Sequence, residues 1–407
     1  MPATIDRAGV PEQETAVRVA ARVSALSTAA PFARPARQPG GPAPILLVSG
    51  APAPESLPLA DFRRAADHIF ADRPGGEAAL DYGPHAGLPG LREWIGRRED
   101  ADPAQVLVTN GALHGISLIF STLLDHGDVV VLDDPVFPDT VRIAEQYGAT
   151  ILPVAVGSDG IDVQAIADHL RAGVRIKVVY TVPDFHNPSG GVLPASDRLW
   201  LVDLAERYGF VIVSDNPYRD TTFGGGYVDD FAVGSSHVVR VGTFTKTLGA
   251  GWRLGWLIAP PWLVPHLENV RRRIDFHSGT VGQSIVLELL GEPGWFDRLL
   301  VRNRSIHREK AAVFSKALAA HTSGDLEFTA PDGGFFVWAT LTSPERTAAP
   351  LVSAAAARGL LLTSGRHFAA DGGRQWNRHL RFAFSAPTVD QLPVAAQRLA
   401  AALDDTR

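Results

Sequence analysis

Short apolar runs alternate with helix-like patterns through the middle of this chain. The runs are nearly continuous rather than alternating, and most end in polar residues. They are QVLVT (105–109), DVVVLDD (128–134), ATILPVAV (149–156), RIKVVYTV (175–182), FVIVSD (210–215), HVVRVGT (237–243) and LGWLIA (254–259). Continuous apolar strands separated by helices predict a mainly parallel sheet covered on both faces. We therefore expect an α/β fold with a seven-stranded sheet.

The pattern changes near residue 300, where a long helical stretch precedes DLEFTAPDGGFFVWATL and LRFAFS. This change predicts a smaller α+β domain over 301–407, after a large domain over 76–300. Residues 45–75 are expected to contribute to the small domain and to the substrate site. Residues 1–44 are rich in Ala, Pro and Arg, which is typical of a partly mobile arm, here with one short helix near Glu12–Ser27.

Polar segments follow several of the predicted strands. They are TNGA, DDPVF, PDFHNPSGG, SDNPY and TFTK. In open α/β sheets, ligands bind beyond the carboxyl ends of the strands. These segments are therefore expected to meet in one site.

The overall composition excludes several classes of protein. The 407 residues are 45% hydrophobic and 20% charged, with a net charge of -6, so no basic surface for nucleic acid or anionic membrane is expected. The chain contains no cysteine, which removes disulfide and thiolate chemistry. No apolar run has the length of a membrane helix, and the N-terminus lacks the pattern of a signal peptide. The cytoplasm is the default expectation.

Lys246, in TFTKTLGAGWRLGW, is one of only four lysines in a chain that otherwise uses arginine. A lysine at a strand end, shielded from water, can lose its proton and form an imine with an aldehyde cofactor. Thr243, Thr245 and Arg253 offer hydroxyls and a guanidinium suited to a phosphate. The alternative is an ordinary surface lysine.

Asp215 follows the apolar run FVIV, so its carboxylate is expected to emerge from a buried strand. A buried carboxylate needs a cationic partner, and a pyridinium nitrogen would serve. Tyr218 could hydrogen-bond a phenolic oxygen on the same ring. The competing interpretation of Asp215 is a helix or turn cap.

Asn110, Gly111 and Ala112 lie between a predicted strand and helix, where amide groups bind phosphate, although most such turns are only connectors. Asn187 could donate to a ring oxygen or a substrate carboxylate, or form only an Asx-turn. Phe137 could stack on a flat ring or belong to the core.

Arg381 alternates with apolar neighbours in HLRFAFS, so it needs an anion. A substrate α-carboxylate would fit its guanidinium, and a structural salt bridge is the equal competitor.

Seven segments in this order resemble the fold type I pyridoxal-phosphate enzymes of aminotransferase class I/II. The resemblance is strongest to the branch of 2-aminoadipate and kynurenine aminotransferases and the C-terminal domain of MocR regulators. It covers the chain from about Ile45 to its end. The segments are ILLVSGAPAPESLP, LDYGPHAGLPGLREWI, VLVTNGALHGI, PDFHNPSGG, SDNPYRD, TFTKTLGAGWRLGW and GGFFVWATL.

The resemblance implies pyridoxal 5'-phosphate as cofactor, with Lys246 as Schiff-base lysine and Asp215 as partner of the pyridine nitrogen. Tyr218 and Asn187 would bind the phenolic oxygen, and Phe137 would stack on the ring. The phosphate would be bound next to Asn110 by Gly111, Ala112, Thr243, Thr245 and Arg253.

The same resemblance implies a substrate site and a second subunit. Arg381 would bind the substrate carboxylate, with Asn187, His186 and the Ser49–Gly50 segment nearby. Tyr82 would reach the phosphate of the partner subunit, which implies a homodimer with shared active sites.

Four residues depart from the family pattern. Leu113 and His186 each stand where glutamine is usual, and Ser214 and Asn216 flank Asp215 where acidic residues are frequent. His186 is either an extra acid or base or a neutral substitute for the amide.

The leading hypothesis is an aminotransferase that moves an amino group between an L-amino acid and a 2-oxo acid. The alternative is a lyase, cyclase or oxidase of amino-acid-derived substrates in specialised metabolism. A MocR-type regulator would need a winged helix-turn-helix, for which residues 1–44 are too few and too rich in proline.

Overall fold

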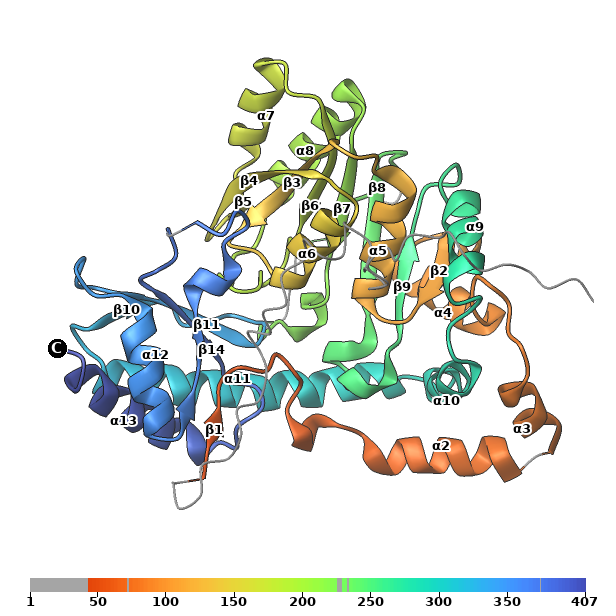
Figure 1. Ribbon diagram of the computed structural model, residues 1–407. Coiled ribbons are helices and arrows are strands. Elements are labelled where there is room, and N and C mark those ends of the chain that lie inside the picture. The colour runs from red at the N-terminus through yellow and green to blue at the C-terminus, as the bar shows by residue number, and fades with distance from the viewer. Residues whose placement is uncertain (1–42, 72, 225–228, 233, 374) are drawn as a thin grey trace, which may run out of the picture.

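The computed structural model describes residues 43–407 except 72, 225–228, 233 and 374. A large sheet with helices on both faces stands above the long helix α11, and a smaller sheet lies beside the C-terminal half of that helix (Figure 1).

The large sheet has eight strands in the order β2-β9-β8-β7-β6-β3-β4-β5. In chain order they are β2 (Val106–Thr109), β3 (Val129–Asp134), β4 (Thr150–Gly157), β5 (Gly160–Ile161), β6 (Ile176–Thr181), β7 (Val211–Asp215), β8 (Val238–Thr243) and β9 (Gly255–Ile258). The five strands from β8 to β4 run parallel, whereas β9 is antiparallel to both neighbours. All seven predicted strands are present. The additional β5 pairs antiparallel with β4, and two residues are too few to leave a pattern in the sequence.

Helices cover both faces of this sheet, which explains the continuous apolar runs. On one face lie α5 (Ala112–Leu123), α6 (Pro138–Gln146) and α9 (Val264–Ile274). On the other lie α7 (Val163–Arg171), α8 (Ala195–Tyr208), α4 (Pro89–Glu99) and α10 (Thr280–Leu290). Strand β3 shows the two-residue period: Val130 and Leu132 pack with the core around α5, and Val131 packs with the core around α7 and α8.

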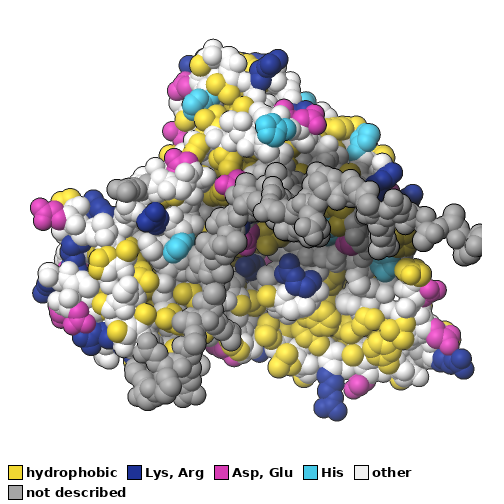
Figure 2. Space-filling model, in the orientation of Figure 1, with side chains coloured by type: hydrophobic (Ala, Val, Ile, Leu, Met, Phe, Trp, Pro, Cys, Tyr) yellow, Lys and Arg dark blue, Asp and Glu magenta, His cyan; other side chains and the backbone are white. Residues whose placement is uncertain are grey.

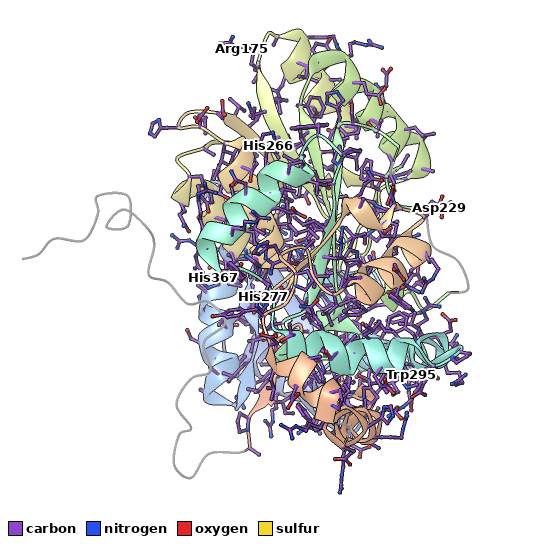
Figure 3. The ribbon with its side chains drawn as sticks, turned by 90° about the vertical axis from the view of Figure 1, so that its right-hand side faces the viewer. Arg175, Asp229, His266, His277, Trp295 and His367 are labelled. Carbon is purple, nitrogen blue, oxygen red and sulfur yellow. The ribbon has the colours of Figure 1, made fainter. Side chains whose placement is uncertain are left out.

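The smaller sheet is antiparallel and has the order β10-β11-β14-β13. Its strands are β10 (Leu326–Phe328), β11 (Phe336–Leu341), β13 (Thr363–Ser364) and β14 (His379–Ala383), and its helices are α12 (Ala348–Ala357) and α13 (Gln391–Asp404). Helix α11 (Trp295–His321) links the two cores: Trp295, labelled in Figure 3, packs with α4 and α10, and Phe314 packs with the small sheet. The predicted boundary at 300/301 therefore falls inside one helix, and the division into domains stays a prediction.

The N-terminal part of the described chain bridges both regions. Strand β1 (Ile45–Leu46) pairs in parallel with β12 (Leu360–Leu361) beside the small sheet. Helices α2 (Leu59–Ala71) and α3 (Arg73–Leu80) follow along the chain and contact α10 below the large sheet. The short helix expected near Glu12–Ser27, with nearly all of the predicted arm, lies outside the described residues. Over the described residues, each helix is too short or too polar to cross a bilayer.

Candidate active site

A cavity of about 370 Å³ lies where the carboxyl ends of β6, β7 and β8 meet the small sheet and the segment after β1. Eleven of the predicted site residues line it: Gly50, Ala112, Phe137, Asn187, Asp215, Tyr218, Thr243, Thr245, Lys246, Arg253 and Arg381. Eight of these residues lie in the polar segments after the strands, and all five segments contribute to the cavity; Gly50, Arg253 and Arg381 come from outside them.

Lys246 follows β8 in a single 3-10 turn, which Thr243 caps by accepting from the amide of Thr245. Its Nζ donates to the carbonyl of Gly50 at 2.9 Å and lies 5.2 Å from the centre of the Tyr218 ring. Burial lowers the pKa of Lys246 to about 8, and the charges of Arg381 and Arg253 act in the same direction against that of Asp215. An amine with such a pKa loses its proton readily, as a nucleophile or base requires.

Asp215 ends β7 and is 7% exposed. Its Oδ2 accepts from the Tyr180 hydroxyl at 2.6 Å, whereas its Oδ1 has no hydrogen-bond partner among the described residues. Burial raises the pKa of Asp215 to about 6, although the Tyr180 hydrogen bond and the charge of Lys246 lower it. A cationic N–H group in the cavity would therefore be a suitable partner for this carboxylate.

The N-terminus of α5 and Arg253 form a second cationic corner of the cavity. Gly111 caps α5 with a φ of 83°, and a Cβ there would lie 2.8 Å from Arg253 Nη2, so only glycine fits. Arg253 itself has a φ of 48° and donates to the carbonyl of Asn110 at 3.2 Å. A non-glycine residue in the left-handed region is uncommon and often marks a functional site. Backbone amides and a guanidinium together suit a phosphate.

Arg381, on β14, forms the opposite side of the cavity and is 2% exposed. It donates to Asn187 Oδ1 at 2.9 Å and to the carbonyl of Val48 at 2.6 Å. Its guanidinium lies 4.5 Å from the centre of the Phe336 ring. Burial lowers the pKa of Arg381 to about 10, which still leaves it charged at neutral pH.

Tyr218 and Phe137 bring aromatic rings to the same cavity. Tyr218 is 3% exposed, and burial raises the pKa of its hydroxyl, so the group is a neutral donor at ordinary pH. Phe137 precedes α6 as its N-cap residue, next to the end of β3.

The side chains of two predicted residues, His186 and Asn110, do not line the cavity. The His186 ring is fully buried, with Nδ1 2.9 Å from Ser189 Oγ and Nε2 3.3 Å from Asp133 Oδ2. This placement does not favour direct contact with a substrate. The side chain of Asn110 turns away to donate to Asp275 at 2.5 Å, so its part in the corner is the carbonyl that accepts from Arg253.

Tyr82 lies on the surface and is 84% exposed. Its ring packs edge-on against Phe276 and against His277, which Figure 3 labels, with centroid distances of 5.6 and 5.9 Å. Tyr82 does not line the cavity of its own chain.

Sequence reasoning missed two residues that shape the cavity. Tyr180 donates to Asp215, and Phe336 packs against both Tyr218 and Arg381. Tyr180 was included in an apolar run, but a tyrosine at the end of a buried strand needs a partner for its hydroxyl, and that signal could have found it. Nothing in the sequence distinguishes Phe336 from its neighbour Phe335.

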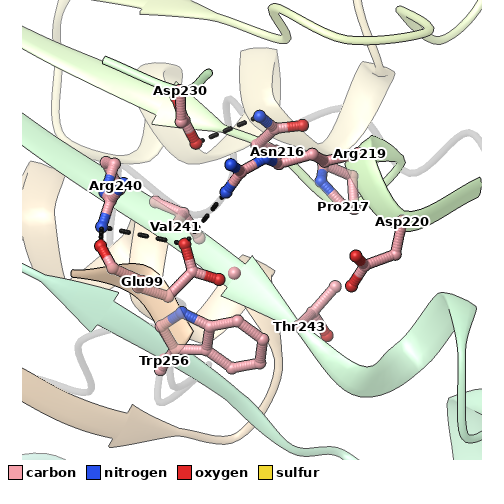
Figure 4. Close-up of a pocket in the computed structure, with 11 residues that line it drawn as sticks. Glu99, Asn216, Pro217, Arg219, Asp220, Asp230, Arg240, Val241, Thr243 and Trp256 are labelled. Atoms are coloured by element: carbon pink, nitrogen blue, oxygen red, sulfur yellow. Dashed lines mark hydrogen bonds and ion pairs between the residues drawn. The ribbon is translucent and has the colours of Figure 1, made fainter. Parts of the chain in front are cut away.

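A second, much smaller polar cavity lies beside the first and shares Pro217 and Thr243 with it (Figure 4). Glu99 Oε2 lies 3.2 Å from Arg219 Nη1 and 3.7 Å from Arg240 Nη2. Burial nevertheless raises the pKa of Glu99.

The unusual neighbours of Asp215 belong to this second group of polar residues. Ser214 donates to Asp230 at 2.8 Å, and Asn216 donates to Asp230 at 3.0 Å and to Asp184 at 2.6 Å. Neutral donors therefore stand beside Asp215 because carboxylates from elsewhere in the chain need them.

The residues of the large cavity fit pyridoxal phosphate. Asp215 offers a buried oxygen to a ring nitrogen, Lys246 an amine to an aldehyde, and the corner at Gly111 and Arg253 suits the phosphate. An α/β fold that carries these groups at the ends of its strands defines the class of pyridoxal-phosphate enzymes with a mainly parallel sheet.

The comparisons with known proteins agree with this class. Residues 47–399 match the family model described as aminotransferase class I and II, and the chain belongs to that family. It is an aminotransferase with pyridoxal 5'-phosphate as its cofactor, moving an amino group between an L-amino acid and a 2-oxo acid. The alternative of a lyase, cyclase or oxidase gains no support from the comparisons.

Similar proteins share most of the length of this chain. The 2-aminoadipate transaminase of Thermus thermophilus is 31% identical, over 89% of this chain and 90% of that protein. The aromatic-amino-acid aminotransferase 1 of Thermococcus litoralis is 28% identical, over 88% and 87%. Among solved structures, the alpha-aminoadipate aminotransferase of Thermus thermophilus, complexed with N-(5'-phosphopyridoxyl)-L-leucine, matches with a TM-score of 0.84 and 29% identity, over 89% of this chain and 92% of that one.

Proposed function

We propose that Lys246, Asp215 and Arg381 are the residues through which this chain carries out transamination. The observation that carries the proposal is their convergence on one cavity from three distant segments, each with the charge that its role requires. Bound pyridoxal phosphate supplies an electron sink for the carbanion chemistry. Asp215 would keep the ring nitrogen protonated, and Thr243, Thr245, Arg253 and the amides of Gly111 and Ala112 would bind the phosphate.

Lys246 would hold the cofactor through its aldehyde, and once the substrate amino group has displaced it there, the freed amine would act as the base. Arg381 would bind the substrate α-carboxylate, supported by Asn187, so that the α-hydrogen faces the Lys246 amine. The amine would take this proton from the α-carbon of the substrate and deliver it to the former aldehyde carbon of the cofactor. Its lowered pKa suits a group that must change protonation state near neutral pH.

The test is an absorbance spectrum of the purified holoenzyme as single amino acids are added without an oxo acid. Transamination predicts that the cofactor band is lost, that one equivalent of 2-oxo acid appears, and that an added oxo acid restores the band. A band that returns without an added acceptor would contradict the proposal.

We also propose that the active form is a homodimer. Exposed apolar side chains lie on α2, at the end of α3 and just after it, at the end of α9 and in the turn before α10: Leu59, Phe70, Leu80, Tyr82, Ile274 and Phe276. Figure 2 shows hydrophobic side chains grouped over the region where Figure 1 places α2, α3 and α10. Phe276 has a φ of 68°, which is unusual for a bulky residue and fits a ring positioned for a contact.

Tyr82 would then reach the phosphate corner of the second subunit. Sedimentation equilibrium tests the dimer, and Tyr82→Phe tests the hydroxyl. The expected result is a dimer in both proteins, with weaker cofactor binding in the variant. A monomeric, fully active wild-type protein would contradict the proposal. The cytoplasmic location and a biosynthetic role stay predictions.

A further inference from the structure

The segment after β1 lies between the two groups that would bind a substrate amino acid. The carbonyl of Val48 accepts from Arg381, and the carbonyl of Gly50 accepts from Lys246. If Arg381 binds the α-carboxylate and Lys246 faces the α-carbon, as proposed above, this segment runs alongside the α-carbon. The substrate side chain would therefore extend over the residues from Leu46 to Ala51, which line the cavity apart from Leu47.

Most of this wall is hydrocarbon, and Ser49 adds one hydroxyl. Leu46 and Val48 contribute aliphatic side chains, and the Phe336 ring closes the space beside Gly50, where a Cβ would lie 2.8 Å from Phe336 Cζ. Across the cavity, Leu113 and Ile116 on α5 continue the apolar lining. Leu113 stands where the family pattern has an amide.

The charged residues that line the cavity in the described part of the chain are Asp215, Lys246, Arg253 and Arg381. Each of them has a role in the proposed function: ring nitrogen, aldehyde, phosphate and α-carboxylate. A second carboxylate on the substrate would thus be placed against hydrocarbon, carbonyl oxygens and the neutral Ser49 hydroxyl. Removing a carboxylate from water without a cationic partner is strongly unfavourable.

We propose that this aminotransferase acts on amino acids with uncharged, apolar side chains and discriminates against dicarboxylic amino acids such as 2-aminoadipate. The inference rests on the proposed roles of Lys246 and Arg381. It names a substrate class that differs from the one in the name of the 31% identical relative.

The test compares substrates of similar length with and without the second carboxylate. The holoenzyme is mixed with L-norleucine or L-2-aminoadipate, and with L-leucine or L-glutamate, while the cofactor absorbance and the 2-oxo acid are followed. We expect the apolar member of each pair to react with a specificity constant at least ~100-fold higher.

A variant tests whether the wall itself causes the discrimination. Leu46→Arg adds a cation to a half-buried position in the wall. It should lower the ratio of the specificity constants for norleucine and 2-aminoadipate by on the order of 10-fold. Leu199→Arg adds the same charge to the exposed face of α8, 70% exposed, and should leave the preference unchanged.

The outcomes separate the inference from the function on which it rests. If no amino acid changes the cofactor absorbance, the proposed roles of Lys246 and Arg381 fail together with the inference. If 2-aminoadipate reacts as well as norleucine or better, the function stands and the inference is wrong. If Leu46→Arg folds and the preference stays at its wild-type value, the wall is not its cause and the inference is also overturned.

Discussion

Two groups of buried charged residues share Pro217 and Thr243 as a common wall, yet they are built differently. Around Glu99, carboxylates and guanidinium groups satisfy one another at 2.5 to 3.7 Å. In the large cavity, Lys246 donates to a backbone carbonyl and Asp215 accepts from a neutral hydroxyl. Charges supported by neutral partners remain available to a ligand, whereas charges that pair with each other stabilise the fold.

The pKa values in the large cavity fit this availability to a ligand. Burial moves the pKa of Lys246 down to about 8 and that of Asp215 up to about 6, so both groups titrate near neutral pH. Groups of this kind concentrate at functional sites because catalysis needs both protonation states within reach.

The largest effect should come from removing the amine. Lys246→Ala should lower kcat by roughly 10³-fold or more, because it removes both the covalent link to the cofactor and the base. Steady-state assays of oxo acid formation measure the loss. Lys316→Ala, at an exposed position on α11, should remain at the wild-type rate. If the Lys246→Ala enzyme turns over many times near the wild-type rate, the large cavity would not be the catalytic site in the way proposed.

The second prediction concerns the paired group around Glu99. Glu99→Ala leaves Arg219 and Arg240 without this carboxylate and should lower the free energy of unfolding by about 3–5 kcal/mol, while turnover per active site is retained. Urea unfolding of the two proteins measures this difference.

Glu309→Ala, at an exposed site on α11, is the matched control and should change stability by less than about 0.5 kcal/mol. A large loss of turnover with unchanged stability would show that the Glu99 group serves catalysis, and the comparison would break.

His186 provides a third, smaller test, because its buried ring lies 3.3 Å from Asp133 and does not line the large cavity. If its ring serves mainly to satisfy Asp133, His186→Gln should lower the free energy of unfolding by about 1–3 kcal/mol and leave KM for the amino acid unchanged. Urea unfolding and initial-rate kinetics check the two parts. If KM changes while stability stays at the wild-type value, the result would support direct contact between His186 and the substrate.

The smallest expected effect is a shift in the pH dependence of Lys246 in the large cavity. In cofactor-free protein, the reaction of Lys246 with pyridoxal phosphate should accelerate with pH and level off above about 8. Asp215→Asn removes an anion that favours the charged amine, so its midpoint should lie lower. Stopped-flow absorbance measures both profiles, and a midpoint near 10.5, the value of an ordinary lysine, would contradict the burial argument.

The same shift has a defined sign for stability. The unfolded chain keeps the lysine proton up to about pH 10.5, whereas the folded protein releases it near 8. Between these values the unfolded state binds more protons, so the free energy of unfolding should rise with pH in cofactor-free protein. Lys246→Met should lose this contribution.

The sequence predicted seven strands of the large sheet and half of the residues that line the cavity, largely because these follow from local pattern. An apolar run that ends in a polar residue determines the strand and also the place where that residue emerges, as for Asp215 and Lys246. The positions of Asn110 and His186 could not be predicted in this way. Their side chains turn toward Asp275 and Asp133, which are distant in sequence, and only the tertiary packing selects these partners.

The contacts around the cavity also connect the two ends of the described chain. The hydrogen bond from Lys246 to Gly50 spans 196 positions, and that from Arg381 to Val48 spans 333. Contacts of such sequence separation form only when nearly all of the chain has folded, because the intervening loop must first be closed. Cofactor binding should therefore report completed folding, and a nascent chain that lacks β14 should not yet bind pyridoxal phosphate with native affinity.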